Sequence, residues 1–329
     1  MKLYIIGNGF DLNHGFKTSY WDYREFLKEH YARALSDFES FQYIDLHRSN
    51  DKWSDLEDSL TIDYDTLMYE AVENYYPNLS DDSDSRWYDL EIDLEQQIEF
   101  IYDFTGKFFY EWFLSTDFSS PRHILDFLDT NSLYLTFNYT STLEDVYKIS
   151  SENIYHIHGH IKQISPTDIQ GTPIFSSIKT IEDAEVDELI KINSFNSDIV
   201  RDTIQFGSVK NDPKPIAQDL KSQYQQDDFY EVSLKTGVDS IVGFCNAASK
   251  NLERNYPTLK NFLSERPIDE VIVMGHSIMG VDLSYYSDII IPGLKECLWR
   301  FYCHRELDMQ NANKFAKKFS LAKICIEKW

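Results

Sequence analysis

The stretch that decides the fold is LYIIGNGFDLNHG, residues 3–15, an apolar run that ends in two glycines one residue apart. The run from Lys2 to Ile6 predicts a short buried strand, because a brief apolar segment bounded by glycine is typical of one. Gly7 and Gly9 then predict a tight turn into a helix, of the kind that surrounds the phosphates of a ligand. This is the opening unit of an α/β fold.

The apolar pattern of the first strand returns after residue 130. It predicts strands in the segments 132–140, 153–161, 269–277, 296–304 and 322–329, a helix over 309–319, and a short strand near Thr203 to Phe206. Strands that alternate with helices favour a parallel sheet. The sequence therefore predicts an α/β fold.

Between the first strand and residue 130, the apolar residues recur at helical spacing instead. Residues 90–114 predict one long aromatic-rich helix, and Ser120 with Pro121 predicts the start of another. We interpret residues 18–130 as an all-helical insertion within a single nucleotide-binding domain of residues 1–329. Residues 162–235 are polar and predict an elaborate crossing segment.

The charge balance and the apolar runs exclude several classes of protein. There are 31 basic and 55 acidic residues, a net charge of −24, which disfavours general nucleic-acid binding. No apolar stretch approaches the roughly 18 residues of a membrane span, and the N-terminus lacks the pattern of a signal peptide. The four cysteines show no C-x-x-C spacing, so neither a disulfide framework nor a cysteine zinc site is expected. We expect a soluble cytoplasmic protein.

Four of the predicted strands end in polar tripeptides. These are Gly7-Asn8-Gly9, Phe137-Asn138-Tyr139, His158-Gly159-His160 and Gly275-His276-Ser277. Ligands of parallel sheets gather at the carboxyl ends of the strands. We expect one pocket to be lined by Gly7, Asn8, Asn138, His158, Gly275 and Ser277.

The glycine pair has two readings. Gly7 and Gly9 match the first two glycines of the dinucleotide fingerprint, but Leu12 stands where the third belongs, which disfavours a hydride-transfer enzyme. A plain strand-to-helix turn accounts for them equally well. Asp11 and Asp282 likewise fit either helix caps or ligands of ribose hydroxyls.

The alternating histidines also leave alternatives open. On a regular strand His156, His158 and His160 would project from one face and could hold zinc. Gly159 indicates instead that the strand ends at His158, which is then placed for acid–base work while the other two are structural. Asn138 is either a turn residue or a neutral group that holds a ribose hydroxyl or a water.

Taken together, these motifs resemble the AbiH family of phage abortive-infection proteins. The resemblance is carried by LYIIGNGFDLNHGFKTSY, WSDLE, TFNYTSTLEDVY, HIHGHI and VIVMGHSIMGVDLSYY. More remotely, the same motifs resemble the sirtuin-like NAD-consuming fold, in which Thr140 stands where an aspartate is expected. The resemblance implies a Rossmann-like (sirtuin-like) parallel sheet with a helical insertion after its first strand.

The resemblance also implies a reaction, the hydrolysis of NAD at its nicotinamide–ribose bond. Asn138 would position the ribose or a water, and His158 would be the base. The nucleotide would lie against Gly7, Asn8, Gly9, Phe10, Asp11, Gly275, His276, Ser277 and Asp282. NAD would be the substrate, and no resident metal is expected. The resemblance also implies a phage-derived trigger. Assembly into a homo-oligomer is left open.

Two other functions fit the sequence. A nucleotide-binding sensor of infection without catalysis would tolerate the change at Thr140. A metal-dependent hydrolase would use His156, His158 and His160 as ligands. Release of nicotinamide from NAD distinguishes the NAD hydrolase from the sensor. Metal analysis of the purified protein distinguishes the metal-dependent hydrolase from both.

Overall fold

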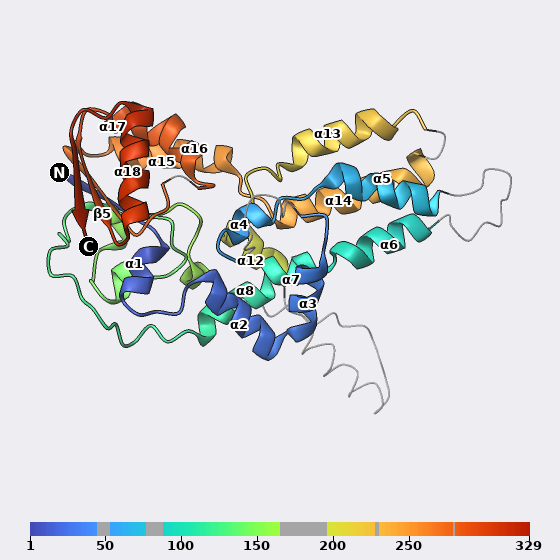
Figure 1. The fold of residues 1–329 in the computed structure, drawn as a ribbon, viewed down its shortest axis with the longest axis horizontal. Helices are drawn as coiled ribbons and strands as arrows, with labels where there is room; N and C mark the ends of the chain where they lie inside the picture. Colours follow the sequence, from blue (N-terminus) through green and yellow to red (C-terminus); the bar gives the residue numbers. More distant parts are fainter. Residues whose placement is uncertain (45–52, 77–87, 165–195, 228–229, 279) are drawn as a thin grey trace.

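A single parallel sheet forms one end of the molecule in a computed structural model that describes residues 1–44, 53–76, 88–164, 196–227, 230–278 and 280–329 (Figure 1). All five neighbouring strand pairs in its six strands are parallel. In spatial order the strands are β3 (Ile154–His156), β2 (Leu133–Thr136), β1 (Lys2–Ile6), β4 (Glu270–Met274), β5 (Leu298–Cys303) and β6 (Ile324–Lys328). The predicted α/β class with a parallel sheet is confirmed.

Each face of the sheet is covered by its own apolar cluster, as the two-residue period of a strand requires. Leu3 and Ile5 of β1 face a cluster that includes Phe315 of α18, whereas Tyr4 and Ile6 face a cluster that includes Phe10 of α1. The helices and turns around the sheet are α1 (Asn8–Asn13), α9 (Thr142–Asp145), η2 (Ser151–Asn153), η3 (Ile161–Gln163), α15 (Leu252–Ser264), α16 (Leu283–Tyr285), η5 (Tyr286–Ile290), α17 (Ile291–Leu294) and α18 (Glu306–Phe319).

A helical lobe stands beside the sheet and is assembled from two distant parts of the chain (Figure 1). The part after β1 supplies α2 (Tyr20–His30), α3 (Ala32–Ser40), α4 (Leu56–Ser59), α5 (Tyr64–Tyr75), α6 (Asp89–Ile98), α7 (Phe100–Thr105) and α8 (Lys107–Ser115). The part after β3 supplies α12 (Ser197–Thr203), α13 (Pro213–Tyr224), the π-helical turn η4 (Tyr230–Leu234) and α14 (Lys235–Ala247).

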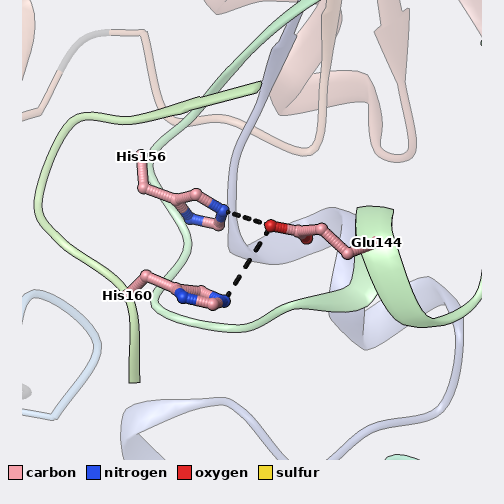
Figure 2. Close-up of side chains that lie close together, drawn as sticks. All are labelled: Glu144, His156 and His160. Carbon is pink, nitrogen blue, oxygen red and sulfur yellow. Dashed lines mark hydrogen bonds and ion pairs between the residues drawn. The ribbon is translucent and has the colours of Figure 1, made fainter. Parts of the chain in front are cut away.

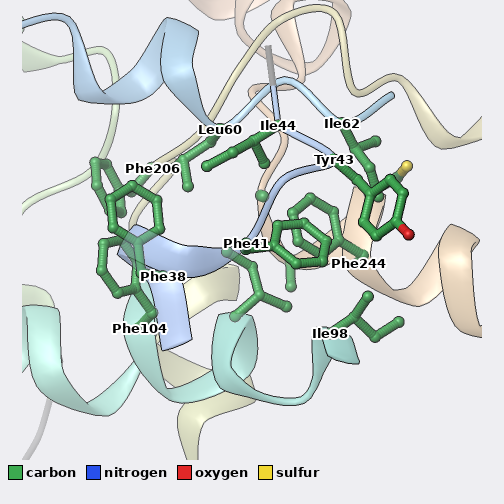
Figure 3. Close-up of a cluster of buried hydrophobic side chains, with 14 of the residues drawn as sticks. Phe38, Phe41, Tyr43, Ile44, Leu60, Ile62, Ile98, Phe104, Phe206 and Phe244 are labelled. Atoms are coloured by element: carbon green, nitrogen blue, oxygen red, sulfur yellow. The ribbon is translucent and has the colours of Figure 1, made fainter. Parts of the chain in front are cut away.

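The two parts of the lobe share one aromatic core (Figure 3). Phe109 stacks on Phe206 with ring centroids 4.1 Å apart, and Phe41 stacks on Phe244 at 5.9 Å. The predicted helical segment after the first strand therefore has a partner that the sequence did not reveal. Nowhere in the described ranges is a helix both long and apolar enough to cross a bilayer.

Three predicted elements differ from the structure. The helix expected over 90–114 is divided into α6, α7 and α8, with the last break at Gly106, where a side chain would collide with Ser197. The helix expected from Ser120 is wrong. Backbone amides of this segment bond to other elements instead, Arg122 to the His14 carbonyl and Leu125 to the Tyr147 hydroxyl.

The short strand expected near Thr203 to Phe206 is also wrong. Thr203 is the last residue of α12, and the Gln205 amide donates a single bond to the His158 carbonyl. Ile204 and Phe206 are buried in the lobe core, so their alternation reflects packing rather than a strand. Much of the crossing segment predicted over 162–235, residues 165–195, lies outside the described residues.

Candidate active site at the carboxyl edge of the sheet

The order of the strands reverses between β1 and β4. The chain continues from β1 to β2 and β3 on one side, and from β4 to β5 and β6 on the other. In open parallel sheets, ligands bind beyond the carboxyl ends of the strands where the order reverses. The loops after β1 and β4 meet at this point.

The glycines of these two loops allow their backbones to touch. The Gly7 and Gly9 amides donate to the carbonyls of Met274 and Gly275, at 3.0 and 2.8 Å. A Cβ on Gly7 would lie 2.5 Å from His276 Cα, and a Cβ on Gly275, which has φ +63°, would lie 2.2 Å from the Phe10 amide nitrogen. The Gly9 amide is thus engaged within the protein, and the glycines serve close packing of the two loops.

The remaining predicted ligands in these loops lie in different surroundings. Asn8 is half-buried and donates from Nδ2 to the Thr18 carbonyl at 2.6 Å. Phe10 is fully buried in the apolar cluster on one face of the sheet. Ser277 is exposed. Of the three, Ser277 is the most exposed.

Asp11 is fully buried and is held by the loop after β2 and by the first residue of α9. It accepts hydrogen bonds from Thr140 Oγ1 and Thr142 Oγ1, both at 2.6 Å, and from Asn138 Nδ2 at 3.1 Å. Burial raises the pKa of Asp11 to about 6, against the opposing effect of these three donors. An aspartate is expected at position 140. Thr140 instead donates its hydroxyl to the carboxylate of Asp11, which comes from α1.

A second buried group of polar residues joins the sheet to the helical lobe. His158 Nε2 lies 2.9 Å from Asp282 Oδ1, and Lys250 Nζ donates to the same oxygen at 3.2 Å and to Glu57 Oε2 at 2.5 Å. His276 Nε2 lies 3.4 Å from Asp282 Oδ2. We call Glu57, His158, Lys250, His276 and Asp282 the Lys250 cluster.

Two members of the Lys250 cluster were missed in the sequence. Glu57 lies in α4, within the WSDLE motif, and Lys250 follows α14. The WSDLE motif could have indicated Glu57. Lys250 is an isolated lysine in a polar segment, and no sequence pattern marks it as a site residue. Asp282 occupies the N-cap position of α16, yet its side chain makes no capping bond and turns to the cluster instead.

The charges in the Lys250 cluster follow from burial and proximity. Burial and the Lys250 ammonium lower the pKa of His158, so its imidazole is neutral. Burial opposes ionisation of Asp282, but Lys250 and His158 outweigh it and hold the pKa of Asp282 well below its ordinary value. Burial also opposes the charge on Lys250, and the two carboxylates overcome it and raise the Lys250 pKa.

Glu57 acts as a hydrogen-bond acceptor on both oxygens. Besides Lys250, it accepts from the hydroxyls of Tyr20 and Tyr139 at 2.8 and 2.9 Å, the pattern of an ionised carboxylate. Two carboxylates therefore face one ammonium and a neutral imidazole. Among these four largely buried groups, carboxylates outnumber ammonium groups by two to one.

His158 presents a free lone pair within the protein. We assign the ring hydrogen to Nε2, because the Asp282 carboxylate is the nearer partner at 2.9 Å, against 3.4 Å for Lys250 Nζ, and this tautomer leaves Nδ1 unprotonated. In the described part of the chain, His158 Nδ1 and Asn138 Oδ1 are both buried without a hydrogen-bond partner. These atoms belong to the two residues predicted to be catalytic. Their side chains meet different carboxylates, Asp11 and Asp282.

The other two histidines of the HIHGHI motif face a separate group. β3 ends at His156, and Gly159 has φ +82°, so the chain turns before His160. Both rings point at Glu144 of α9 (Figure 2), with Nε2 atoms 2.9 and 3.9 Å from its Oε1. Burial and His156 lower the pKa of His160 to about 4. The three-histidine face that a regular strand would create does not form, because His158 lies in the Lys250 cluster.

The chain was also compared with known proteins. The family model described as Bacteriophage abortive infection AbiH matches residues 3–302, nearly the whole chain. No curated protein and no solved structure matches it. The matched span contains the Lys250 cluster and the group around Glu144.

Proposed function

We propose, from the premise that this chain belongs to the AbiH family of bacteriophage abortive-infection proteins, that it hydrolyses NAD in the cytoplasm of an infected cell. The reaction centre is the Lys250 cluster, and the bond cleaved is the one between nicotinamide and ribose. Loss of NAD would stop the metabolism of the infected cell before phage production is complete.

The observation that carries this proposal is the excess of carboxylates in the Lys250 cluster, where Glu57 and Asp282 share the single ammonium of Lys250. Cleavage of a ribose–nitrogen bond passes through a transition state with positive charge on the sugar ring. A buried site with excess negative charge stabilises such a state, whereas it repels the anionic centre of a phosphoryl transfer. Asp282 and Glu57 supply that charge, and Lys250 prevents it from becoming too costly to bury.

The free lone pair of His158 fits the second requirement of the reaction. Nicotinamide leaves without a proton, because its ring nitrogen keeps the electrons of the broken bond, so the protein needs a base rather than an acid. His158 Nδ1 accepts the proton of the attacking water, while Asp282 orients the imidazole through Nε2. The buried amide oxygen of Asn138 is available to a ribose hydroxyl. The products are nicotinamide, ADP-ribose and a proton.

The strand order supports a nucleotide as the substrate. The order β3-β2-β1-β4-β5-β6 is that of the classic dinucleotide-binding fold, and favours a Rossmann-like classification. The loops after β1 and β4 lie where the strand order reverses, the position at which folds of that kind hold their ligand. A phage-derived trigger is part of this proposal, because an enzyme that destroys NAD must be silent in a healthy cell.

The test is release of nicotinamide by the full-length protein, prepared from both uninfected and phage-infected cells. We expect nicotinamide from NAD with the wild-type protein and none with Asp282→Asn. Asp288→Asn, an exposed carboxylate six positions along the same segment, is the matched control and should keep the activity. Lack of nicotinamide in both wild-type preparations would overturn the hydrolase and leave a nucleotide sensor, which NAD binding by calorimetry would then identify.

A further inference from the structure

We propose that Glu144, His156 and His160 bind one divalent transition-metal ion of the zinc class, at a site separate from the Lys250 cluster. Figure 2 shows the three side chains converging from α9, from the end of β3 and from the turn after Gly159. The inference does not depend on NAD hydrolysis.

Both ring nitrogens of His156 face oxygen atoms. Its Nδ1 lies 3.3 Å from the Asn138 carbonyl oxygen, and its Nε2 lies 2.9 Å from Glu144 Oε1. Both oxygens are acceptors when Glu144 is ionised, so either both ring nitrogens carry hydrogens or a cation takes the place of one hydrogen. The Asn138 carbonyl fixes the ring in the orientation that a metal-ligating histidine commonly has.

A second hydrogen on His156 would not provide a partner for two other buried atoms of this group. Among the residues that the structure describes, His160 Nε2 and Glu144 Oε2 are buried and have no hydrogen-bond partner. Buried polar atoms are nearly always paired, so each such atom calls for a missing partner. A metal ion between the three side chains would bind His160 Nε2 and the Glu144 carboxylate, and it would take the place of the hydrogen between His156 and Glu144.

The spacing of the three residues suits a small cation. One ligand atom from each residue lies within 4.8 Å of the others, and the Nε2 atoms of His156 and His160 lie 2.9 and 3.9 Å from Glu144 Oε1. In a tetrahedral zinc site with bonds of about 2.0–2.1 Å, neighbouring ligand atoms are about 3.3 Å apart. Shifts of less than about an ångström would therefore complete the coordination.

The donor set and its exposure define the kind of site. Two imidazoles and a carboxylate without sulfur suit zinc and other first-row divalent ions, and three protein ligands leave a position open to water or substrate. The Glu144 side chain keeps 23% of its surface exposed, against 1% for Lys250, so an ion can reach this site from solvent.

The experiment is titration of the chelator-treated, full-length protein with ZnCl₂, with a chromophoric chelator as competitor. We expect one equivalent to bind to the wild type. Glu144→Gln and His160→Gln should weaken binding by more than the roughly 10–100-fold that loss of an outer partner costs. Asp145→Asn, the neighbouring carboxylate that pairs with Lys162, and His304→Gln, an exposed histidine, are controls that should retain the ion.

Cobalt(II) provides a second readout on the same proteins, because its absorption spectrum reports ligand type. We expect a spectrum of low-coordinate cobalt without a thiolate band in the wild type, lost in both variants. Circular dichroism confirms that the variants are folded. Lack of stoichiometric binding to the wild type, or binding that persists in folded Glu144→Gln and His160→Gln, overturns the site.

Discussion

Lys250 donates to Glu57 across 193 residues of sequence, and this contact joins the two parts of the chain that build the helical lobe. The same ammonium reaches Asp282, which follows the central part of the sheet. One lysine thus ties both halves of the lobe to the carboxyl edge of the strands. Because all three side chains are largely buried, the Lys250 cluster is complete only when lobe and sheet are assembled.

Replacing Lys250 by methionine should destabilise the protein strongly. The change leaves Glu57 and Asp282 buried without their cation, and breaking a buried pair in this way costs about 3–5 kcal/mol. Chemical denaturation measures the free energy of unfolding. Lys260→Met, at an exposed position, should change that free energy by no more than about 0.5 kcal/mol. Equal stability of the two variants would contradict the role given to Lys250.

Replacing His158 by alanine should remove the base of the proposed reaction. We expect NAD hydrolysis and phage defence to be lost, with a rate reduction on the order of 10²–10⁴. His160→Ala should have a milder effect on NAD cleavage, because its ring lies against Glu144. His304→Ala is the exposed control, and the assay is nicotinamide release by protein that retains its thermal unfolding transition. Full activity in folded His158→Ala protein would defeat the mechanism.

Asp11 should make stability depend on pH. Its pKa is raised from 3.8 to about 6 in the folded protein, so the folded state binds the proton more tightly than the unfolded state. Stability is then lost as pH rises from about 4 to about 6, by an amount on the order of 3 kcal/mol. Asp11→Asn removes this loss. The wild type should become steadily less stable relative to Asp11→Asn across that interval, as measured by denaturation at each pH. A constant difference would show that Asp11 does not titrate there.

Gly275 should not tolerate a side chain. A Cβ would approach the Phe10 amide nitrogen to 2.2 Å, and the residue has φ +63°, which alone costs about 1–3 kcal/mol for other residues. Gly275→Ala should therefore lower the melting temperature markedly. Gly293→Ala is the matched control, because no atom lies within 4 Å of its Cβ and alanine favours the helix α17. A melting temperature unchanged in both variants would contradict the close packing of the two loops.

The sheet could be predicted from the sequence because its strands are apolar and short. β1 begins and ends where the run from Lys2 to Ile6 does, and the strands near 270, 300 and 325 follow equally clear patterns. β2 and β3 end earlier than predicted, at Thr136 and His156. Their apolar patterns continue beyond the sheet because Phe137 and Ile157 are buried in the apolar cluster on one face.

Only part of the candidate site could be predicted from the sequence, because the burial of a side chain depends on its partners in the fold. The sequence indicated His158 and Asp282 through their place after apolar strands, but a buried lysine has the same local pattern as an exposed one. Lys250 is identified only by its partners, which come from α4 and from the loop after β4. The prediction that Asn138, His158 and the two glycine loops line one ligand pocket stays a prediction.

The positions of its members along the chain also set when the Lys250 cluster can be completed during synthesis. Glu57 is made well before Lys250 and Asp282, and β1 pairs with β4 only after residues 270–274 have been made. Contacts between such distant residues form late in folding. A nascent chain that has not yet reached Asp282 therefore lacks the completed arrangement of charges in the Lys250 cluster, whatever part of the helical lobe it has already formed.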